Sequence, residues 1–406
     1  MIPRGLTVSL LQSLRDSPVV FLQGARQTGK STLVQALAAG KHPARYLTLD
    51  HAGVLAAARE DPQAFVAGLS GPTIIDEMQR APELASAIKA SVDARREAGR
   101  FLLTGSASVL LLPKISDALV GRVEIHTLWP FTQGEILGRP ERFIDDLFSR
   151  DYSPASRPGG GDRNDLIDRI VLGGYPGVLQ RRGHERRRAW FGSYITTLLQ
   201  RDVRDISNIE GLTAVPRLLS LLGARSGSLL NSAEVSRSLS MPVSTLKRYM
   251  ALLETTFLVQ LLPAWSSNLG KRLVKSPKVL IVDSGLLCHL IGADAKRLAA
   301  DATLLGHVLE SFVVMELRKQ QGWSRVRPEI YHYRTATGGE VDVVLETPAG
   351  EIVGIEVKAS STVKAGDFKG LKALRDLVGR RFRRGIVLYP GREPLAFGAD
   401  QLALPL

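Results

Sequence analysis

The stretch GARQTGKST (residues 24–32) decides the fold of the N-terminal part of the chain. It lies between the apolar run PVVFL (residues 18–22) and the helical pattern LVQALAAG. A G-x-x-x-x-G-K-S pattern between a strand and a helix is typical of a P-loop, whose glycines let backbone N–H groups face a phosphate. We expect Lys30 to reach the outer phosphates and Ser31 to offer its hydroxyl to Mg²⁺. The predicted ATP-binding residues are Gly24, Ala25, Arg26, Gln27, Thr28, Gly29, Lys30, Ser31 and Thr32.

An acidic strand end further along the chain predicts that the bound nucleotide is hydrolysed. The apolar run in PTIIDEMQR ends in two acids. We expect Asp76 to hold Mg²⁺ and Glu77 to polarise the attacking water. The alternative is an acidic strand end that only faces solvent. The spacing from the P-loop leaves room for one further strand, ARYLTLD, which ends in Asp50, as a parallel sheet requires.

Two later positions are candidates for contact with the γ-phosphate. GRFLLTGSAS predicts a strand that ends in Thr104, Gly105 and Ser106, and we expect Ser106 near the γ-phosphate. A simple turn at the end of the strand is the alternative. Downstream, Gly121 and Arg122 end a predicted short helix. Arg122 fits either stabilisation of the phosphoryl group transferred in a neighbouring subunit or a buried structural role.

These motifs together resemble the AAA+ ATPases, and more closely a bacterial and archaeal group of predicted ATPases. The resemblance rests on GARQTGKST, IIDEMQ, LLTGSAS, a GR pair followed by WPFTQGE, and GGYPGVL, and it extends over nearly the whole chain. It implies a homo-oligomeric ring, often hexameric, with ATP held between neighbouring subunits. It also implies that the second half carries a domain of unknown function that is similar to restriction-endonuclease folds.

The composition favours a nucleic-acid partner. The chain of 406 residues has 53 Lys and Arg against 40 Asp and Glu, a formal net charge of +13. Such an excess attracts polyanions, and DNA is the expected partner, although a role in solubility gives the same sign. The single cysteine, Cys288, excludes an internal disulfide and a multi-cysteine zinc site. No apolar stretch approaches the roughly 20 residues that cross a bilayer, so we expect a cytoplasmic protein that does not bind membranes.

The middle of the chain predicts a loop followed by helices. SRDYSPASRPGGGDRND (residues 149–165) is rich in Pro, Gly and Ser and predicts a mobile loop. Residues 229–265 predict a helix-turn-helix with a wing, whose second helix begins at Val243. Such a helix enters a DNA groove or serves as a spacer between proteins; its outward residues are Ser244, Thr245, Lys247 and Arg248. A basic run before it faces phosphates or forms a solvated helical face: Arg181, Arg182, Arg186, Arg187 and Arg188.

The C-terminal third predicts a cluster of carboxylates with a lysine. GHVLESFVVMELRKQ (residues 306–320) predicts a helix with Glu310 among apolar neighbours. Two later strands carry Asp342 and, in IVGIEVKAS (residues 352–360), Glu356 and Lys358 on one face. This D…E-x-K arrangement is that of restriction-type nucleases, in which the carboxylates hold Mg²⁺ and the lysine neutralises developing charge or positions the nucleophile. The predicted metal ligands here are Glu310, Asp342 and Glu356. The alternative is a buried ion-pair network without catalysis.

A basic turn follows this cluster, and it fits either DNA docking or a solubilising tip: Arg380, Arg381, Arg383 and Arg384.

We therefore predict an α/β protein with four parts. These are a P-loop AAA+ domain with a parallel sheet (1–150), a linker and helical region (151–225), a winged-helix-like region (226–300) and a restriction-endonuclease-like α/β domain (301–406). The predicted function is ATP hydrolysis coupled to remodelling or processing of DNA, such as branched DNA in repair, recombination or defence. The alternative is a nucleotide-gated protein-interaction or regulatory switch, such as a toxin–antitoxin or stress module, with an inert nuclease-like domain. Nuclease activity is left open.

Overall fold

The computed structural model describes residues 1–108, 113–152, 162–206, 214–335 and 338–406. Contacts divide the chain into two compact units: Met1–Phe131 with Ala251–Leu258, and Thr132–Met250 with Val259–Leu406. Residues 153–161 of the predicted mobile loop lie outside the described residues. Among the helices of the described part, none has the length and apolarity needed to span a bilayer. The four predicted domain boundaries stay predictions.

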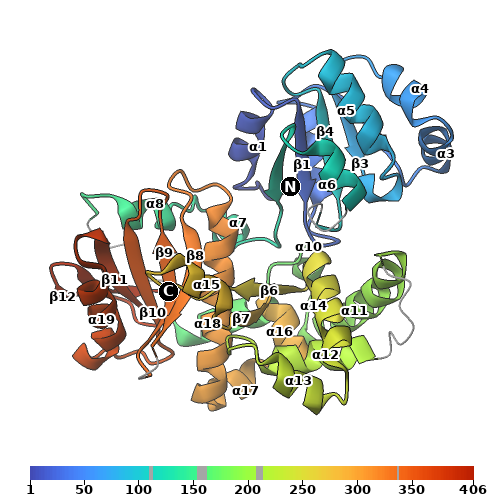
Figure 1. The fold of residues 1–406 in the computed structure, drawn as a ribbon. Coiled ribbons are helices and arrows are strands. Elements are labelled where there is room, and N and C mark those ends of the chain that lie inside the picture. Colours follow the sequence, from blue (N-terminus) through green and yellow to red (C-terminus); the bar gives the residue numbers. More distant parts are fainter. Residues whose placement is uncertain (109–112, 153–161, 207–213, 336–337) are drawn as a thin grey trace. The chain divides into compact units, whose positions relative to one another are not determined.

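The first unit is built on a five-stranded sheet in the order β2-β3-β4-β1-β5, and every pair of neighbouring strands is parallel (Figure 1). Its strands are β1 (Val19–Gln23), β2 (Arg45–Thr48), β3 (Thr73–Asp76), β4 (Phe101–Gly105) and β5 (Val123–Thr127). Its helices are α1 (Thr7–Ser13), α2 (Lys30–Ala38), α3 (Ala52–Glu60), α4 (Pro62–Ala67), α5 (Leu84–Ala94) and α6 (Pro113–Leu119). The predicted parallel α/β sheet is confirmed.

The core of this unit explains its sequence pattern. Strands β1, β3 and β4 are buried along their whole length, as expected where helices cover a parallel sheet, so they read as short apolar runs. Leu84, Ile88 and Val92 recur every fourth residue on α5 and join Phe101 and Leu103 of β4 in one cluster. Because the strands are parallel, their carboxyl ends share one edge, and this edge receives the predicted nucleotide-site residues.

The first half of the second unit is helical. Its helices are α7 (Gln133–Leu137), α8 (Phe143–Phe148), α9 (Arg163–Leu172), α10 (Pro176–Leu179), α11 (His184–Ile206), α12 (Ala214–Ala224), α13 (Ser232–Ser238) and α14 (Val243–Thr255), the last of which continues into the first unit. Strands β6 (Val259–Leu262) and β7 (Lys278–Ile281) then form an antiparallel pair, and Leu229 bridges to Lys278 at its edge. The predicted helix, turn, helix and apolar strand are all present, and α14 begins at the predicted Val243.

The second half of this unit combines one long helix, α18, and several short ones with a six-stranded mixed sheet. Helices α15 (Leu269–Val274), α16 (Ser284–Leu290), α17 (Ala295–Ala300), α18 (Ala302–Gln321) and α19 (Lys369–Val378) accompany strands β8 (Glu329–Arg334), β9 (Glu340–Glu346), β10 (Ile352–Val357), β11 (Phe382–Tyr389), β12 (Leu395–Gly398) and β13 (Gln401–Pro405). The sheet order is β12-β13-β11-β10-β9-β8, with β8, β9 and β10 as an antiparallel meander and β11 parallel to β10. Leu371 and Leu374 of α19 pack with Val341 and Ile352 in its core.

Candidate functional site

The P-loop has the backbone geometry that its sequence predicts. Gly29 has a left-handed φ of 93° and caps the N-terminus of α2, which is where N–H groups are available for a phosphate. Gly24 has a φ of 152°, and a Cβ there would lie 2.2 Å from the carbonyl oxygen of Leu128, so a larger residue does not fit. The Nζ of Lys30 donates to the carbonyl oxygens of Gly24 and Ala25 at 2.8 and 2.9 Å. These bonds hold the buried ammonium on the loop that would bind the phosphates.

Three side chains, from β2, β3 and β4, form one hydrogen-bond network with the backbone N–H of Glu77. Asp76 is buried, and its carboxylate accepts hydrogen bonds from the hydroxyls of Tyr46, at 2.7 Å, and Thr104. The same Thr104 hydroxyl accepts from the backbone N–H of Glu77 at 3.1 Å. The structure thus joins the predicted metal ligand Asp76 and the predicted base Glu77 through one threonine. Burial and Asp76 raise the pKa of Tyr46 to about 12, so Tyr46 stays a donor to this carboxylate.

The carboxylate of Glu77 is oriented by two partners. Glu77 itself has a left-handed φ of 63°. Gln79 donates from Nε2 to the Glu77 carboxylate and, at 2.8 Å, to the hydroxyl of Ser106. Ser106 in turn donates to Glu77 Oε2 at 3.3 Å. Glu77, the predicted base, and Ser106, the predicted γ-phosphate contact, therefore lie in direct contact.

Arg122 is paired within its own chain. Its Nε and NH2 donate to the two oxygens of Asp93 at 2.6 and 2.9 Å. This bidentate pair lowers the pKa of Asp93 and raises that of Arg122. The Arg122 side chain is 31% exposed, so it is not a buried structural arginine. It is nevertheless paired, with Asp93. Its action on a neighbouring subunit stays a prediction.

The predicted C-terminal residues come together as the strand pattern predicts. Asp342 of β9 accepts a hydrogen bond from the backbone N–H of Val357 at 2.8 Å, beside Glu356 on the adjacent strand β10. The Nζ of Lys358 donates to Glu356 Oε1 at 2.8 Å. Burial, and then the charge of Asp342, raise the pKa of Glu356 to about 7. Glu310, on α18, completes the cluster, and burial followed by the Asp342 charge raises its pKa to about 8.

A second lysine, which the sequence did not single out, enters the same cluster. The Nζ of Lys278 lies 2.6 Å from Glu310 Oε1, 2.6 Å from Glu340 Oε1 and 3.9 Å from Asp342 Oδ1, and its side chain is only 3% exposed. Although burial disfavours the ammonium, the charges of Glu310 and Asp342 outweigh burial and raise the pKa of Lys278. Lys278 therefore stays protonated across the physiological range and neutralises part of the carboxylate charge.

The predicted metal ligands are arranged around this ammonium. Within the described residues, no group of three or more His, Cys, Asp or Glu side chains is arranged to hold a metal ion. Glu310, Asp342 and Glu356 are therefore neighbours without forming such a group in this structure. Carboxylate oxygens are suitable ligands for Mg²⁺, so their metal-binding role stays a prediction.

The predicted basic turn ends earlier than expected, because Arg383 and Arg384 lie on β11, and three of its four arginines have protein partners. Arg383 donates to Glu351 at 2.9 Å, and Arg381 lies 3.6 Å from Glu346. Arg384 donates to the carbonyl oxygen of Ser149 at 2.5 Å. These contacts anchor the segment to its own unit. They do not decide between a solubilising tip and a DNA-docking surface, and both stay predictions.

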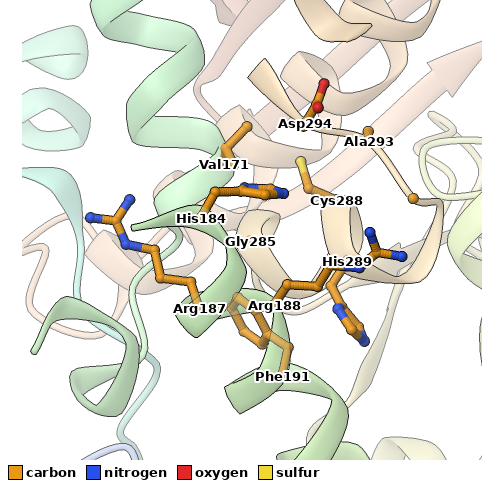
Figure 2. Close-up of a pocket in the computed structure, with 11 residues that line it drawn as sticks. Val171, His184, Arg187, Arg188, Phe191, Gly285, Cys288, His289, Ala293 and Asp294 are labelled. Atoms are coloured by element: carbon orange, nitrogen blue, oxygen red, sulfur yellow. The ribbon is translucent and has the colours of Figure 1, made fainter. Parts of the chain in front are cut away.

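The basic run of α11 borders a hollow in the second unit. A cavity of about 60 Å³ is lined by His184, Arg187, Arg188 and Phe191 of α11 and by Cys288 and His289 of α16, as Figure 2 shows. A larger hollow of about 580 Å³ shares His184, Arg187 and Asp294 with it and adds Arg169 and Lys296. Burial, and then the charge of Arg188, lower the pKa of His289. Cationic side chains from several helices therefore surround one depression, with Asp294 and Asp168 as its acids.

Three further residues in the hydrogen-bond and ion-pair networks of the predicted site residues were not predicted from the sequence. Gln79 follows Glu77 by two positions, and its amide can bond two partners at once, a signal that the motif contained. Lys278 opens the apolar run KVLIV, where a charge needs a partner, so its burial could have been anticipated. Glu340 gave no separate signal, because acids at strand ends are common and usually face solvent.

A match to a known family model agrees with the N-terminal geometry. Residues 16–137 match a family model described as an AAA domain. Residues 163–297 and 305–406 match two domains of unknown function, DUF8612 and DUF4143. A structural comparison finds the RuvB Holliday junction branch migration motor of Thermotoga maritima, with 16% identity, a TM-score of 0.26, and coverage of 63% of this chain and 86% of that one.

The parallel sheet, the P-loop and the acidic end of β3 define a P-loop nucleotide-binding protein with an AAA domain. Two uncharacterized proteins, from Mycobacterium bovis and Mycobacterium tuberculosis, are each 32% identical to it over 406 residues, covering 99% of this chain and 83% of theirs. The chain belongs to the same family as these mycobacterial proteins.

Proposed function

We propose that this protein is an ATPase that binds Mg²⁺–ATP at the P-loop and hydrolyses it to act on DNA. One observation carries the ATPase part: the P-loop, Asp76, and the contact between Glu77 and Ser106 all lie at the carboxyl edge of one parallel sheet. In this assignment Lys30 binds the outer phosphates, Ser31 and Asp76 hold Mg²⁺, and Glu77 polarises water while Ser106 contacts the γ-phosphate. A homo-oligomeric ring, with Arg122 serving a neighbour, is part of the proposal.

Two variants test the ATPase assignment. Lys30→Ala should weaken ATP binding by at least tenfold, because it removes the cation at the phosphates. Glu77→Gln should keep ATP affinity near that of the wild type and reduce turnover by at least about 100-fold, because only activation of water is lost. ATP affinity is measured by calorimetry and turnover by phosphate release with Mg²⁺. Equal loss of ATP affinity in both variants contradicts the assignment.

The DNA part of the proposal is supported by charge. The net charge of +13 and the cationic hollow beside α11 suit phosphodiester groups, which attract proteins largely through Lys and Arg. The helices α13 and α14 followed by the β6–β7 pair are in the order of a winged helix, and Ser244, Lys247 and Arg248 are exposed on α14. Both features make DNA the favoured polymer, with remodelling or processing as the action.

Paired charge removal tests the hollow as a DNA-phosphate contact. The double variant Arg188→Ala/Lys296→Ala removes one charge that lines the hollow and one that lines the smaller cavity sharing His184 and Arg187 with it; Arg182→Ala/Arg186→Ala removes two exposed charges that line neither. We expect only the first variant to weaken binding to linear, single-stranded and branched DNA, and to reduce the slope of log affinity against log salt by about 1 to 2. DNA affinity is measured by fluorescence anisotropy, and equal losses in both variants contradict the contact.

We propose a restriction-endonuclease-like fold for residues 301–406, on the order α18, the β8–β9–β10 meander, α19 and β11. Asp342, Glu356 and Lys358 have the positions of its D…E-x-K residues, with Glu310 as an added carboxylate. The second candidate function is a nucleotide-gated regulatory switch in which this domain is inert. The ammonium of Lys278 among the carboxylates favours it.

One assay separates the two functions. ATPase rates are measured with a panel of DNA structures, and nicking is recorded in parallel with Mg²⁺ and Mn²⁺. The DNA-acting function requires that DNA changes the ATPase rate and that nucleotide changes DNA affinity. Nicking that disappears in Lys358→Ala while ATP hydrolysis persists would make the C-terminal domain a nuclease. The absence of both couplings and of nicking leaves the switch as the better proposal.

A further inference from the structure

The C-terminal carboxylate cluster is closed by a residue from outside its own sheet. Glu340 and Asp342 lie on β9, and Glu310 lies on α18, within the part of the chain that matches DUF4143. Lys278 begins β7, within the part that matches DUF8612. Its Nζ lies 2.6 Å from both Glu310 and Glu340. One ammonium thus joins two segments of the chain that are matched separately.

The connection between β6 and β7 is fixed to the C-terminal sheet along its length. The backbone N–H of Trp265 donates to the carbonyl oxygen of His332 on β8 at 2.6 Å, and the backbone N–H of His332 donates to the carbonyl oxygen of Pro263 at 3.0 Å. Farther along, Arg272 donates to both oxygens of Glu346 at 2.5 and 3.1 Å. These contacts hold the connection that leads into β7, where Lys278 lies. The fold therefore sets the position of the Lys278 ammonium.

The Lys278 ammonium contacts carboxylate oxygens that would be ligands of a divalent cation in this cluster. Glu310 Oε1 and Glu340 Oε1 both contact Nζ, and Asp342 Oδ1 lies 3.9 Å away. A divalent ion among the same carboxylates would lie close to a fixed positive charge, and because the Lys278 side chain is only 3% exposed, solvent would screen their repulsion weakly. In the same cluster, Glu356 Oε2 is buried and has no hydrogen-bond partner among the described residues.

We propose that Lys278 is a built-in counter-ion that takes the place of a divalent metal in the carboxylate cluster. The cluster is closed to divalent cations while the β6–β7 connection is docked, and it binds one only when the Lys278 ammonium is withdrawn. This inference goes beyond the proposed function, because it holds whether or not the C-terminal domain acts on DNA and whether or not ATP is bound.

Manganese binding to the full, nucleotide-free chain tests this inference. We expect Lys278→Met, which keeps an unbranched side chain of similar length and removes its charge, to bind Mn²⁺ at least tenfold more tightly than the wild type. Adding Asp342→Asn should abolish the gain, which assigns the ion to this cluster. The matched control is Lys275→Met, in the same connection, whose Nζ contacts a carbonyl oxygen at 3.5 Å and no carboxylate. Bound Mn²⁺ is followed by electron paramagnetic resonance and calorimetry.

A charge-balancing variant keeps the test decisive if Lys278→Met folds poorly. Glu310→Gln removes one carboxylate that Lys278 neutralises, so the double variant Lys278→Met/Glu310→Gln should regain part of the thermal stability lost in Lys278→Met. A counter-ion role is overturned if the double variant is no more stable than Lys278→Met. It is overturned equally if the wild type binds Mn²⁺ at Asp342 as tightly as Lys278→Met does. Both outcomes leave the ATPase assignment untouched, because that is judged by Lys30 and Glu77.

Discussion

At the scale of residues, the proposed hydrolysis depends on how the Glu77 carboxylate is held. A general base must point at the water it activates, and a carboxylate on a flexible side chain loses that orientation. Here the left-handed backbone at Glu77 ends the strand, and Gln79 and Ser106 fix the side chain from one side. In the proposed assignment Gln79 is a positioning residue, since it acts through Glu77 and Ser106 and does not itself contact the nucleotide.

Gln79→Ala tests this positioning role. Removing the amide leaves Glu77 with one hydroxyl partner, so we expect turnover to fall by about 10-fold to 100-fold while ATP affinity stays within twofold. Gln79→Glu is the second variant, because it keeps the shape but puts a like charge beside Glu77. Turnover and ATP affinity are measured separately. A parallel loss of ATP affinity in Gln79→Ala would show that the residue supports the whole site and not the base alone.

A single buried acid predicts part of the pH dependence of stability. Burial raises the pKa of Glu141 to about 7, assisted by the charge of Glu316, although hydrogen bonds from Thr132 and Gly134 oppose the shift. The folded state therefore holds a proton that the unfolded state releases above about pH 4.5. The stability from this proton is full below that pH and is lost as pH rises to about 7.

Glu141→Gln should remove this contribution. We expect the free energy of unfolding of the wild type to fall more steeply between about pH 4.5 and pH 7 than that of the variant, by at most about 3 kcal/mol over the interval. Urea unfolding across the pH range measures both slopes. Identical slopes would mean that Glu141 keeps an ordinary pKa in the folded protein.

At the scale of elements, the apolar pattern of the β6–β7 connection does not explain how it packs. Its helix α15 leaves Leu269, Leu273 and Val274 exposed, so apolar burial does not hold it. Arg272 holds it instead, through Glu346 and through contacts over the rings of Trp265 and Tyr331 at 5.4 and 5.0 Å. A polar anchor of this kind fixes the register of the connection and so the place of Lys278.

Arg272→Met should loosen this element. Both members of the pair are almost buried, with side chains 12% and 13% exposed, so removing one leaves a carboxylate poorly compensated. We expect a loss of about 2 kcal/mol in the free energy of unfolding. The control is Arg375→Met, whose pair with Asp376 is exposed and should matter by less than about 0.5 kcal/mol. Comparable losses in the two variants would remove the anchoring role from Arg272.

At the scale of the whole molecule, the open question is whether subunits share a nucleotide site. Arg122 is bound to Asp93 of its own chain, so action on a neighbour requires that this pair opens or that the neighbour's phosphate replaces Asp93. A guanidinium pairs with carboxylate and phosphate through the same planar donors, so the exchange is chemically simple.

Mixing inactive subunits tests the sharing. Arg122→Ala and Glu77→Gln subunits should each lack turnover, and a mixture should recover a fraction of it where an intact Arg122 faces an intact Glu77. Recovery is measured as ATPase rate against mixing ratio, with the assembly size followed by light scattering. A mixture as inactive as its components, in an assembly shown to exchange subunits, would restrict Arg122 to its own chain.

The sequence by itself determined the P-loop between its strand and helix and most elements of the fold. The P-loop, the parallel strands and the D…E-x-K strands are local patterns, because turn glycines, apolar runs and strand alternation act over a few residues. Tertiary structure decided the rest: the pairing of Arg122 with Asp93, the amide of Gln79 between Glu77 and Ser106, and the ammonium of Lys278 among Glu310 and Glu340. Contacts between residues far apart in the chain depend on how the elements pack. A charge in an apolar run therefore predicts that a partner exists, but the sequence does not indicate which residue the fold provides.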